Sequence, residues 1–287
     1  AAAARTSTIR LGTGVMLPAQ REPIVTAKAI ATLQNLSGGR FCCGIGFGWN
    51  EDEMNDHGVD YRTRRAQTRE HVLAMRALWA DEVAGFDGSF VQISPSWSWP
   101  KPEVPVPVLL GGGAGPKLFA HIAEYGNGWI PIGGAGLTDD IGRLKEVVAD
   151  AGRDPESIEI VPFGSLPSHD KLDHFERIGV TECVFRLPSA GRDEVMAVLD
   201  QQAALLAAKT FYDKGNVEAA KSALTWVADK ASDEGYRALA RIRLSGLLLD
   251  TKAYDDALKQ LAGSFPVEFA ALVADRKGDI HLLQGKK

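Results

Sequence analysis

The 287-residue sequence has few cysteines, no excess of positive charge and no long apolar run. Three cysteines, with Cys42 and Cys43 adjacent, are too few for a disulfide framework and favour buried thiols in a reducing cytoplasm. With 32 Lys and Arg against 37 Asp and Glu, the net charge of -5 argues against a nucleic-acid partner. No stretch approaches the roughly 18 apolar residues that a membrane-spanning helix needs. We therefore expect a globular, cytoplasmic chain without a membrane segment.

Patterns for metal binding and nucleophilic catalysis are also scarce. Residues 50–57 are rich in Asn, Asp and Glu, but their spacing fits no EF-hand, and no second His or Cys cluster completes a zinc site. We interpret this run as the solvated start of a helix and expect no metal. No nucleophile elbow is present, and His71 and His121 fall in amphipathic helical stretches. The sequence therefore leaves the catalytic residues unknown.

The first two-thirds of the chain alternate short apolar runs with amphipathic stretches. We expect six strands, at residues 8–15, 41–46, 106–110, 128–131, 158–163 and 180–186, and a small hairpin around Asp87-Gly88. The helices we expect begin at Pro23 and Gly191 or span 63–79, 116–124, 137–151 and 171–177. Strands separated by single helices predict a parallel sheet. The fold class is α/β, a partial (β/α)8 barrel with six of its eight strands.

The last third is Ala-rich and helical, with almost no strand signal. Residues 216–224 superpose on 253–261 at an offset of 37, and residues 248–252 superpose on 282–286 at an offset of 34. Such periods indicate tetratricopeptide-like helix pairs, with an ordinary helical bundle as the alternative. We therefore divide the chain into a barrel domain, residues 1–202, and an all-α domain, residues 203–287.

Two glycine-rich runs, at residues 44–48 and 111–116, end predicted strands. Glycine lets the backbone approach a ligand closely, and the second run leads into a helix whose first turn offers free amides to an anion. Neither run is a dinucleotide fingerprint, because Trp49 stands where a third glycine is required. Tight turns alone explain either run. Two such runs at the same end of successive strands favour a phosphate-bearing ligand there.

Segments 8–15, 31–41, 44–51 and 110–115 resemble the luciferase-like monooxygenase family, and within it the deazaflavin-dependent oxidoreductases. The resemblance covers about residues 1–202. It implies a (β/α)8 barrel that binds coenzyme F420, or alternatively FMN, and transfers a hydride between this cofactor and a small organic substrate. It also allows a homodimer.

By position, the resemblance implies three groups of cofactor-binding residues. Thr13, Gly14 and Val15 match a bulge that backs the flavin-like ring, and a second group matches the loop beside that ring: Gly46, Phe47, Gly48, Trp49 and Asn50. The phosphate cradle is matched by Gly113, Ala114, Gly115 and Pro116. Some relatives have a catalytic acid where Trp49 stands, so the resemblance assigns no acid here.

Family members normally carry two further strand–helix units before Thr8, so the resemblance implies an N-terminally truncated barrel whose two open edges impair activity. Segments 204–216 and 269–279 resemble the tetratricopeptide-like periplasmic domain of the ancillary SecYEG translocon subunit family. That resemblance implies, as an alternative function, a helical module that binds a peptide or protein, here C-terminally truncated. The unusual pairing favours a third alternative, an artificial chimera joined near residues 201–205 and without intact activity.

Overall fold

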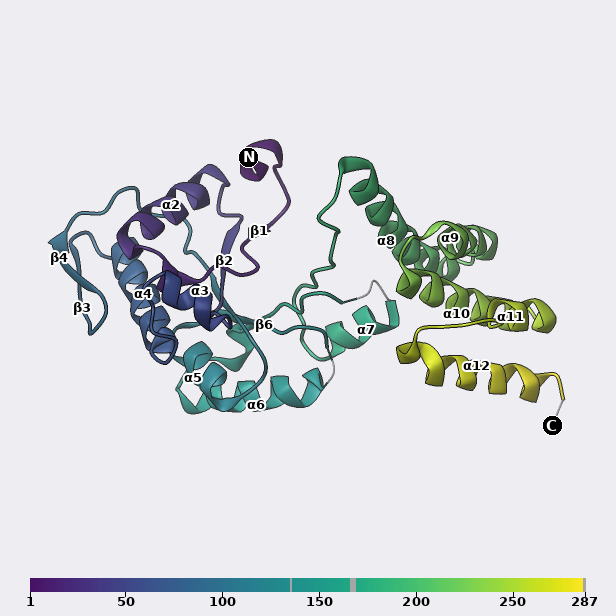
Figure 1. The fold of residues 1–287 in the computed structure, drawn as a ribbon. Coiled ribbons are helices and arrows are strands. Elements are labelled where there is room, and N and C mark those ends of the chain that lie inside the picture. Colours follow the sequence, from purple (N-terminus) through teal and green to yellow (C-terminus); the bar gives the residue numbers. More distant parts are fainter. Residues whose placement is uncertain (135, 166–168, 286–287) are drawn as a thin grey trace. The chain divides into compact units, whose positions relative to one another are not determined.

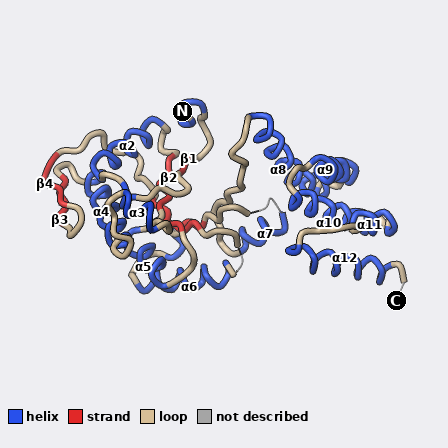
Figure 2. The backbone as a smooth tube through the Cα atoms, in the orientation of Figure 1, coloured by secondary structure: helices blue, strands red, loops and turns tan. Residues whose placement is uncertain are grey.

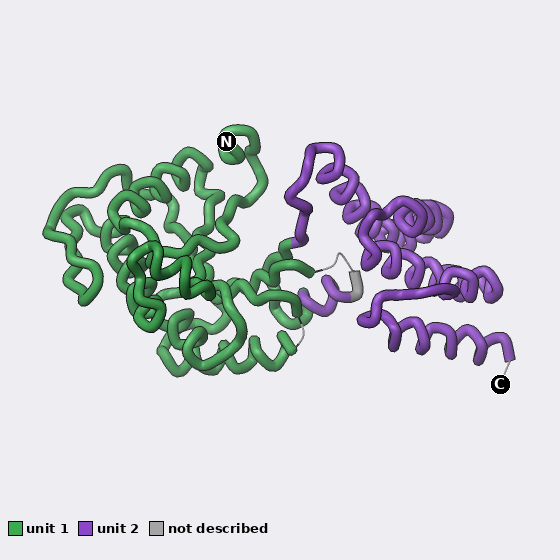
Figure 3. Tube along the Cα trace, viewed as in Figure 1, with its two compact units in different colours: residues 1–165, 176–184 green, residues 166–175, 185–287 purple. Residues whose placement is uncertain are grey.

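The computed structural model describes residues 1–134, 136–165 and 169–285 (Figure 1). It divides into two compact units, coloured separately in Figure 3. The barrel unit comprises residues 1–165 and 176–184, and the helical unit comprises residues 166–175 and 185–287. The boundary predicted after residue 202 lies inside one continuous helix, α8 (Arg192–Asp213).

The barrel unit is built on a parallel sheet of five strands in sequential order. They are β1 (Leu11–Gly12), β2 (Phe41–Ile45), β5 (Val108–Gly111), β6 (Gly128–Ile130) and β7 (Glu159–Ile160). Each coincides with one of the predicted strands, which confirms the parallel α/β architecture. All five residues of β2 are buried, as expected for a strand that is covered on both faces.

The sixth predicted strand, residues 180–186, does not form, and this prediction was wrong. The segment runs beside β7 but makes one isolated bridge, between Phe163 and Val184. Val184 N–H donates to Pro162 O at 2.9 Å, and Gly164 N–H donates to Val184 O at 2.8 Å. The preceding bridge would need an N–H at position 162 to donate to Glu182 O, and proline has none. Pro162 therefore ends the ladder on the amino-terminal side of this bridge.

The helices of the barrel unit follow the predicted alternation. They are α1 (Ala2–Arg5), α2 (Pro23–Leu36), α3 (Glu51–Asp56), α4 (Arg64–Ala80), α5 (Pro116–Tyr125) and α6 (Leu137–Asp150); α7 (His169–Arg177) begins in the helical unit. Short 3-10 turns lie at Pro18–Gln20 and Pro155–Ser157. Helices α2, α4, α5 and α6 pack in succession around the sheet (Figure 1). The predicted hairpin is β3 (Ala84–Asp87) with β4 (Gln92–Ser96), drawn as two strands in Figure 2.

The sheet is curled, so its two edge strands face each other. Between β1 and β7 there are four strand spacings, which would separate them by about 19 Å in a flat sheet. Nevertheless Arg10, next to β1, pairs with Glu159 of β7, and a Cβ on Gly14 would lie 3.6 Å from the Phe163 ring. Apolar side chains fill the space enclosed by the sheet: Cys42, Leu109, Ile130, Val161, Phe163 and Val184.

The helical unit contains α8, α9 (Val217–Lys230), α10 (Glu234–Asp250), α11 (Tyr254–Gln260), a 3-10 turn at Val267–Phe269, and α12 (Ala270–Leu283). The 37-residue offset is visible in the structure, because α9 and α11 begin at equivalent positions and Ala220 and Ala257 are both fully buried. The 34-residue offset pairs residues in different environments. Leu248 of α10 is buried, whereas Leu282 of α12 is 77% exposed. Within the described ranges, no helix has both the length and the apolar character needed to cross a membrane.

Candidate functional site

The candidate site lies where the parallel strands end, because their carboxyl ends share one edge of the sheet. There the segment after β1 meets the segments after β2 and β5. A Cβ built on Gly46 would lie 2.6 Å from Val15 Cγ2, and one on Gly111 would lie 2.9 Å from Val15 Cγ1. The side chain of Val15 therefore rests directly on two glycines of neighbouring strands. Side chains at either position would displace it.

A β-bulge places Val15 there. Gly12 pairs with Cys42, and the next bridge joins Met16 to Ile45, so β1 has one more residue than β2 between the two pairs. Gly44 O accepts from both Met16 N–H at 2.8 Å and the Thr13 hydroxyl at 2.7 Å. A Cβ on Gly44 would lie 1.9 Å from Thr13 O, so this close approach requires glycine. The Gly14–Val15 peptide is cis.

The loop after β2 divides its side chains between the interior and the surface. Phe47 is buried, its ring centroid 5.1 Å from that of His121 and 4.3 Å from the Arg65 guanidinium carbon. Trp49 is 85% exposed. The Asn50 side-chain oxygen accepts from Asp52 N–H and Glu53 N–H, which caps α3 and leaves its amide group for a ligand. Of these five predicted residues, Trp49 is the most exposed.

The loop after β5 leaves open space above its backbone. A Cβ on Gly113 or Gly115 would meet no heavy atom within 4 Å, and Ala114 and Pro116 are exposed. Trp129 Nε1 donates to Gly112 O at 2.9 Å, which fixes the loop from below. Pro116 is the first residue of α5, and its cap, Gly115, has no side chain to satisfy the first-turn amides. These amides are suited to an anion.

Two residues of this face were not among those predicted. Ile132 follows β6, and its side chain is 75% exposed; Val15 is 42% exposed. Its position directly after a predicted strand was the available signal. Lys117 is exposed in the first turn of α5, where it adds a positive charge to the amides. Apolar side chains over glycine, with an amide-rich helix start alongside, suit a planar aromatic group that carries phosphate.

Titratable groups near the site are buried behind it or exposed in α3. Burial, reinforced by Arg65, lowers the pKa of His121, whose ring packs between Phe47 and Tyr125. Burial raises the pKa of Cys43 to about 12. Glu51, Asp52 and Glu53 are exposed in the first turn of α3. Among the described residues, no group of three or more His, Cys, Asp or Glu could hold a metal ion.

The fold and this edge define a (β/α)-barrel protein whose ligand face is the carboxyl end of the sheet. Residues 1–234 match the luciferase-like monooxygenase family, and residues 195–287 match a tetratricopeptide repeat-like domain. The chain belongs to the luciferase-like monooxygenase family and carries a tetratricopeptide-like helical segment. The two matches overlap at residues 195–234, across the predicted join.

Relatives of two kinds are similar to this chain. An uncharacterized protein of Mycobacterium tuberculosis is 46% identical over 209 residues, which are 72% of this chain and 74% of that protein. The F420-dependent glucose-6-phosphate dehydrogenase of Kineococcus radiotolerans is 36% identical over 138 residues, 47% of this chain and 41% of the enzyme.

Among solved structures, an F420-dependent secondary alcohol dehydrogenase in complex with an F420-acetone adduct matches with a TM-score of 0.52 and 26% identity. The match covers 62% of this chain and 56% of that one. The chain thus spans about half the length of these F420-dependent relatives.

Proposed function

We propose that the barrel unit is an oxidoreductase that uses coenzyme F420, with FMN as the alternative, and transfers a hydride to or from a small organic substrate. The observation that supports this proposal most directly is the contact of Val15 with Gly46 and Gly111. It makes a flat, apolar surface at the ligand edge of the sheet. F420-dependent relatives of this family support the choice of cofactor.

The residues present fit such a cofactor. Thr13, Gly14 and Val15 would lie against the face of the ring, and Trp49 and Ile132 would shield its surroundings from water. Gly113 and Gly115 leave room for a phosphate, which the first-turn amides of α5 would bind. The bound cofactor would supply the hydride donor or acceptor. The chain's own contribution is then binding, orientation and exclusion of water.

Spectral titration of the full chain with F420 and, separately, with FMN tests the proposal. We expect saturable changes in cofactor absorbance and fluorescence with micromolar affinity for F420 and weaker binding of FMN. Tighter binding of FMN would assign FMN, rather than F420, as the cofactor. Binding of neither cofactor would show that the site does not function, and the proposal would fail.

A further inference from the structure

The Phe47 ring contacts side chains from two different helices. The Arg65 guanidinium carbon of α4 is 4.3 Å from the centroid of this ring, and the centroid of the His121 ring of α5 is 5.1 Å from it. His121 in turn packs edge-on against Tyr125, with ring centroids 5.5 Å apart. Phe47 is buried, although it belongs to the loop beside the candidate site. The contacts of this one ring therefore connect α4 and α5 to that loop.

Phe47 anchors the loop of residues 46–50. Within this range it is the residue that buries a side chain, because Gly46 has none and the other three residues are partly or fully exposed. Gly46 N–H also donates to Met16 O at 2.8 Å. Gly46 lies directly before Phe47 and under Val15, so a shift of the Phe47 ring would move the surface on which Val15 rests.

Arg65 has no anionic partner. None of the ion pairs formed within the described residues includes it, and its Nη1 is shielded from solvent without a hydrogen-bond partner in the described part of the chain. Burial and the neighbouring Arg64 lower the pKa of Arg65. A half-buried cation without a carboxylate costs stability. Its contact is a cation–π interaction with Phe47, which suits a side chain that holds this ring in place.

His121 is held in its neutral form. Burial, reinforced by Arg65 and Arg69 of α4, lowers the pKa of His121 below the ordinary value of about 6.5. Glu124 of α5 acts in the opposite direction. Arg69 donates to the Glu124 carboxylate at 2.7–2.8 Å and lowers the pKa of Glu124, so this carboxylate keeps its charge in mild acid. His121 is therefore the group of this cluster that gains a charge as the pH falls.

Release of the Phe47 ring would open His121 to water. The pKa of His121 would then return toward its ordinary value, so the released loop binds a proton more tightly than the docked loop. A proton on His121 also adds a second cation, after Arg65, beside the same aromatic ring. Acid therefore favours release. The docked arrangement is complete above the ordinary His pKa and is lost as the pH falls through the lowered value.

We propose that Arg65 and His121 are positioning residues for the cofactor site. They hold Phe47, and through it residues 46–50, in the arrangement that receives the cofactor while His121 is neutral. This inference rests on the proposed function. Both side chains act through the Phe47 ring, so the site loses cofactor affinity in mild acid because of a histidine that does not itself touch the cofactor.

Amide exchange of Gly46, measured by NMR in the full chain without cofactor, tests the positioning directly. The Gly46 N–H donates to Met16 O, so release of the loop exposes it to solvent. After correction for the intrinsic effect of pH on exchange, we expect protection in the wild type to fall at least tenfold between pH 7 and pH 5. His121→Phe keeps an aromatic ring and cannot gain a proton, so this variant should stay protected at both pH values.

The matched control for this experiment is His57→Gln, at an exposed position after α3, which should behave as the wild type does. Protection of Gly46 that is independent of pH in the wild type would overturn the proposal. An equal loss of protection in His121→Phe would overturn it too, because the proton would then bind elsewhere.

Spectral titration with F420 at pH 7 tests the connection to the site. Arg65→Met keeps the aliphatic stem but removes the unpaired charge, so we expect an unfolding midpoint equal to or higher than that of the wild type. The same variant should bind F420 at least fivefold more weakly and lose protection at Gly46. Arg65→Lys, which keeps the charge, should recover part of the affinity. Arg62→Met, at an exposed position, should change neither the midpoint nor the affinity.

A merely structural role for Arg65 would lower the midpoint and the affinity together, and that result would contradict the assignment. Unchanged F420 affinity in Arg65→Met would also contradict it. Binding of neither F420 nor FMN by the wild type would refute the proposed function. The exchange of Gly46, measured without cofactor, would still decide whether Arg65 and His121 hold the loop.

Discussion

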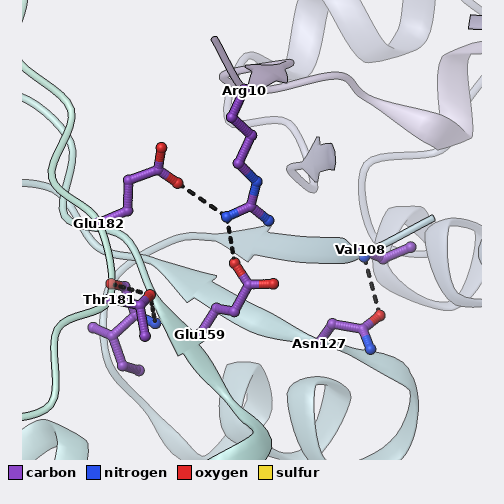
Figure 4. Close-up of polar contacts among 7 residues, drawn as sticks. Arg10, Val108, Asn127, Glu159, Thr181 and Glu182 are labelled. Carbon is purple, nitrogen blue, oxygen red and sulfur yellow. Dashed lines mark hydrogen bonds and ion pairs between the residues drawn. The ribbon is translucent and has the colours of Figure 1, made fainter. Parts of the chain in front are cut away.

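Arg10 Nη1 lies 2.6 Å from Glu159 Oε2 and joins the two edges of the sheet (Figure 4). The same nitrogen lies 3.0 Å from Glu182 Oε2. The hydrogen bond to Glu159 raises the pKa of Arg10, so this cation stays charged at any working pH. One guanidinium thus holds β1, β7 and the segment after it together at the amino ends of the strands.

Replacing Arg10 tests this connection. Arg10→Met keeps the aliphatic stem but leaves two carboxylates without their partner, so we expect the barrel unit to lose about 1–3 kcal/mol of its free energy of unfolding. We expect a loss of stability toward the lower end of this range, because these groups are about a third exposed and solvent screens their interaction. Urea denaturation followed by tryptophan fluorescence measures the loss. Arg143→Met removes an exposed i,i+3 pair with Asp140 and should change stability by less than about 0.5 kcal/mol. Equal effects would contradict the role of Arg10.

Glu70 of α4 holds the tip of the β3–β4 hairpin. Its carboxylate accepts from Ser89, Phe90 and Val91 N–H at 2.6–3.0 Å. Burial raises the pKa of Glu70, but these three hydrogen bonds outweigh burial and leave the pKa lowered. A lowered pKa means that the stabilisation is complete above the ordinary Glu pKa and is lost as the pH falls through the lowered value.

We therefore expect Glu70→Gln to speed amide hydrogen exchange at residues 89–91 severalfold at neutral pH, because a neutral amide offers one acceptor where the carboxylate offers two. Exchange in the wild type should approach the rate of the variant only in acid. Glu82→Gln, at an exposed position nearby in the sequence, is the control. Unchanged exchange in Glu70→Gln would show that the hairpin holds its tip without this carboxylate.

Replacing Gly113 tests the cofactor proposal without changing the stability of the fold. A Cβ there meets no heavy atom within 4 Å, so we expect a valine to leave the fold unaffected but to occupy the space assigned to phosphate. We expect Gly113→Val to weaken F420 at least tenfold with an unchanged unfolding midpoint. Gly142→Val, on α6 and equally unobstructed, should leave the affinity unchanged. Wild-type affinity in Gly113→Val would place the phosphate elsewhere.

The three cysteine thiols should differ in reactivity. Burial raises the pKa values of both Cys42 and Cys43, that of Cys43 to about 12, so both stay protonated and shielded at pH 8. Cys183 is half-buried. We expect a thiol-specific aromatic disulfide reagent to modify about one thiol in the native protein and all three after unfolding. Cys183→Ser should abolish the native reaction, and a rapid native reaction in that variant would contradict the burial of the pair.

The architecture could be predicted from sequence because its signals are local. Helix α2 begins at Pro23 and ends before two glycines with positive φ, both visible as residue types. The loss of pairing before Val184 depends on Pro162, which follows β7 and lies opposite that segment. The partner that a strand will meet is not a local property. The Arg10–Glu159 pair could not be predicted for the same reason, because its members are 149 residues apart in the sequence.

The candidate site, like the fold, could be predicted from sequence only in part. Its location followed from glycines at the ends of successive strands, but the directions of its side chains did not. Phe47 and Trp49 are two residues apart in one loop, yet one is buried and the other exposed. The difference arises because Arg65 of α4 and His121 of α5 receive the Phe47 ring. That packing is set by tertiary contacts.

The bulge after β1 has a consequence for how this sequence can vary in length. Side chains alternate between the faces of a strand, so removing or adding one residue between Gly12 and Met16 would exchange inside for outside in the residues that follow until pairing resumed. Glycine-containing turns usually tolerate insertions and deletions. Here a one-residue deletion would carry Val15 off Gly46 and Gly111. We expect homologous chains to vary in residue type across this segment and to conserve its length.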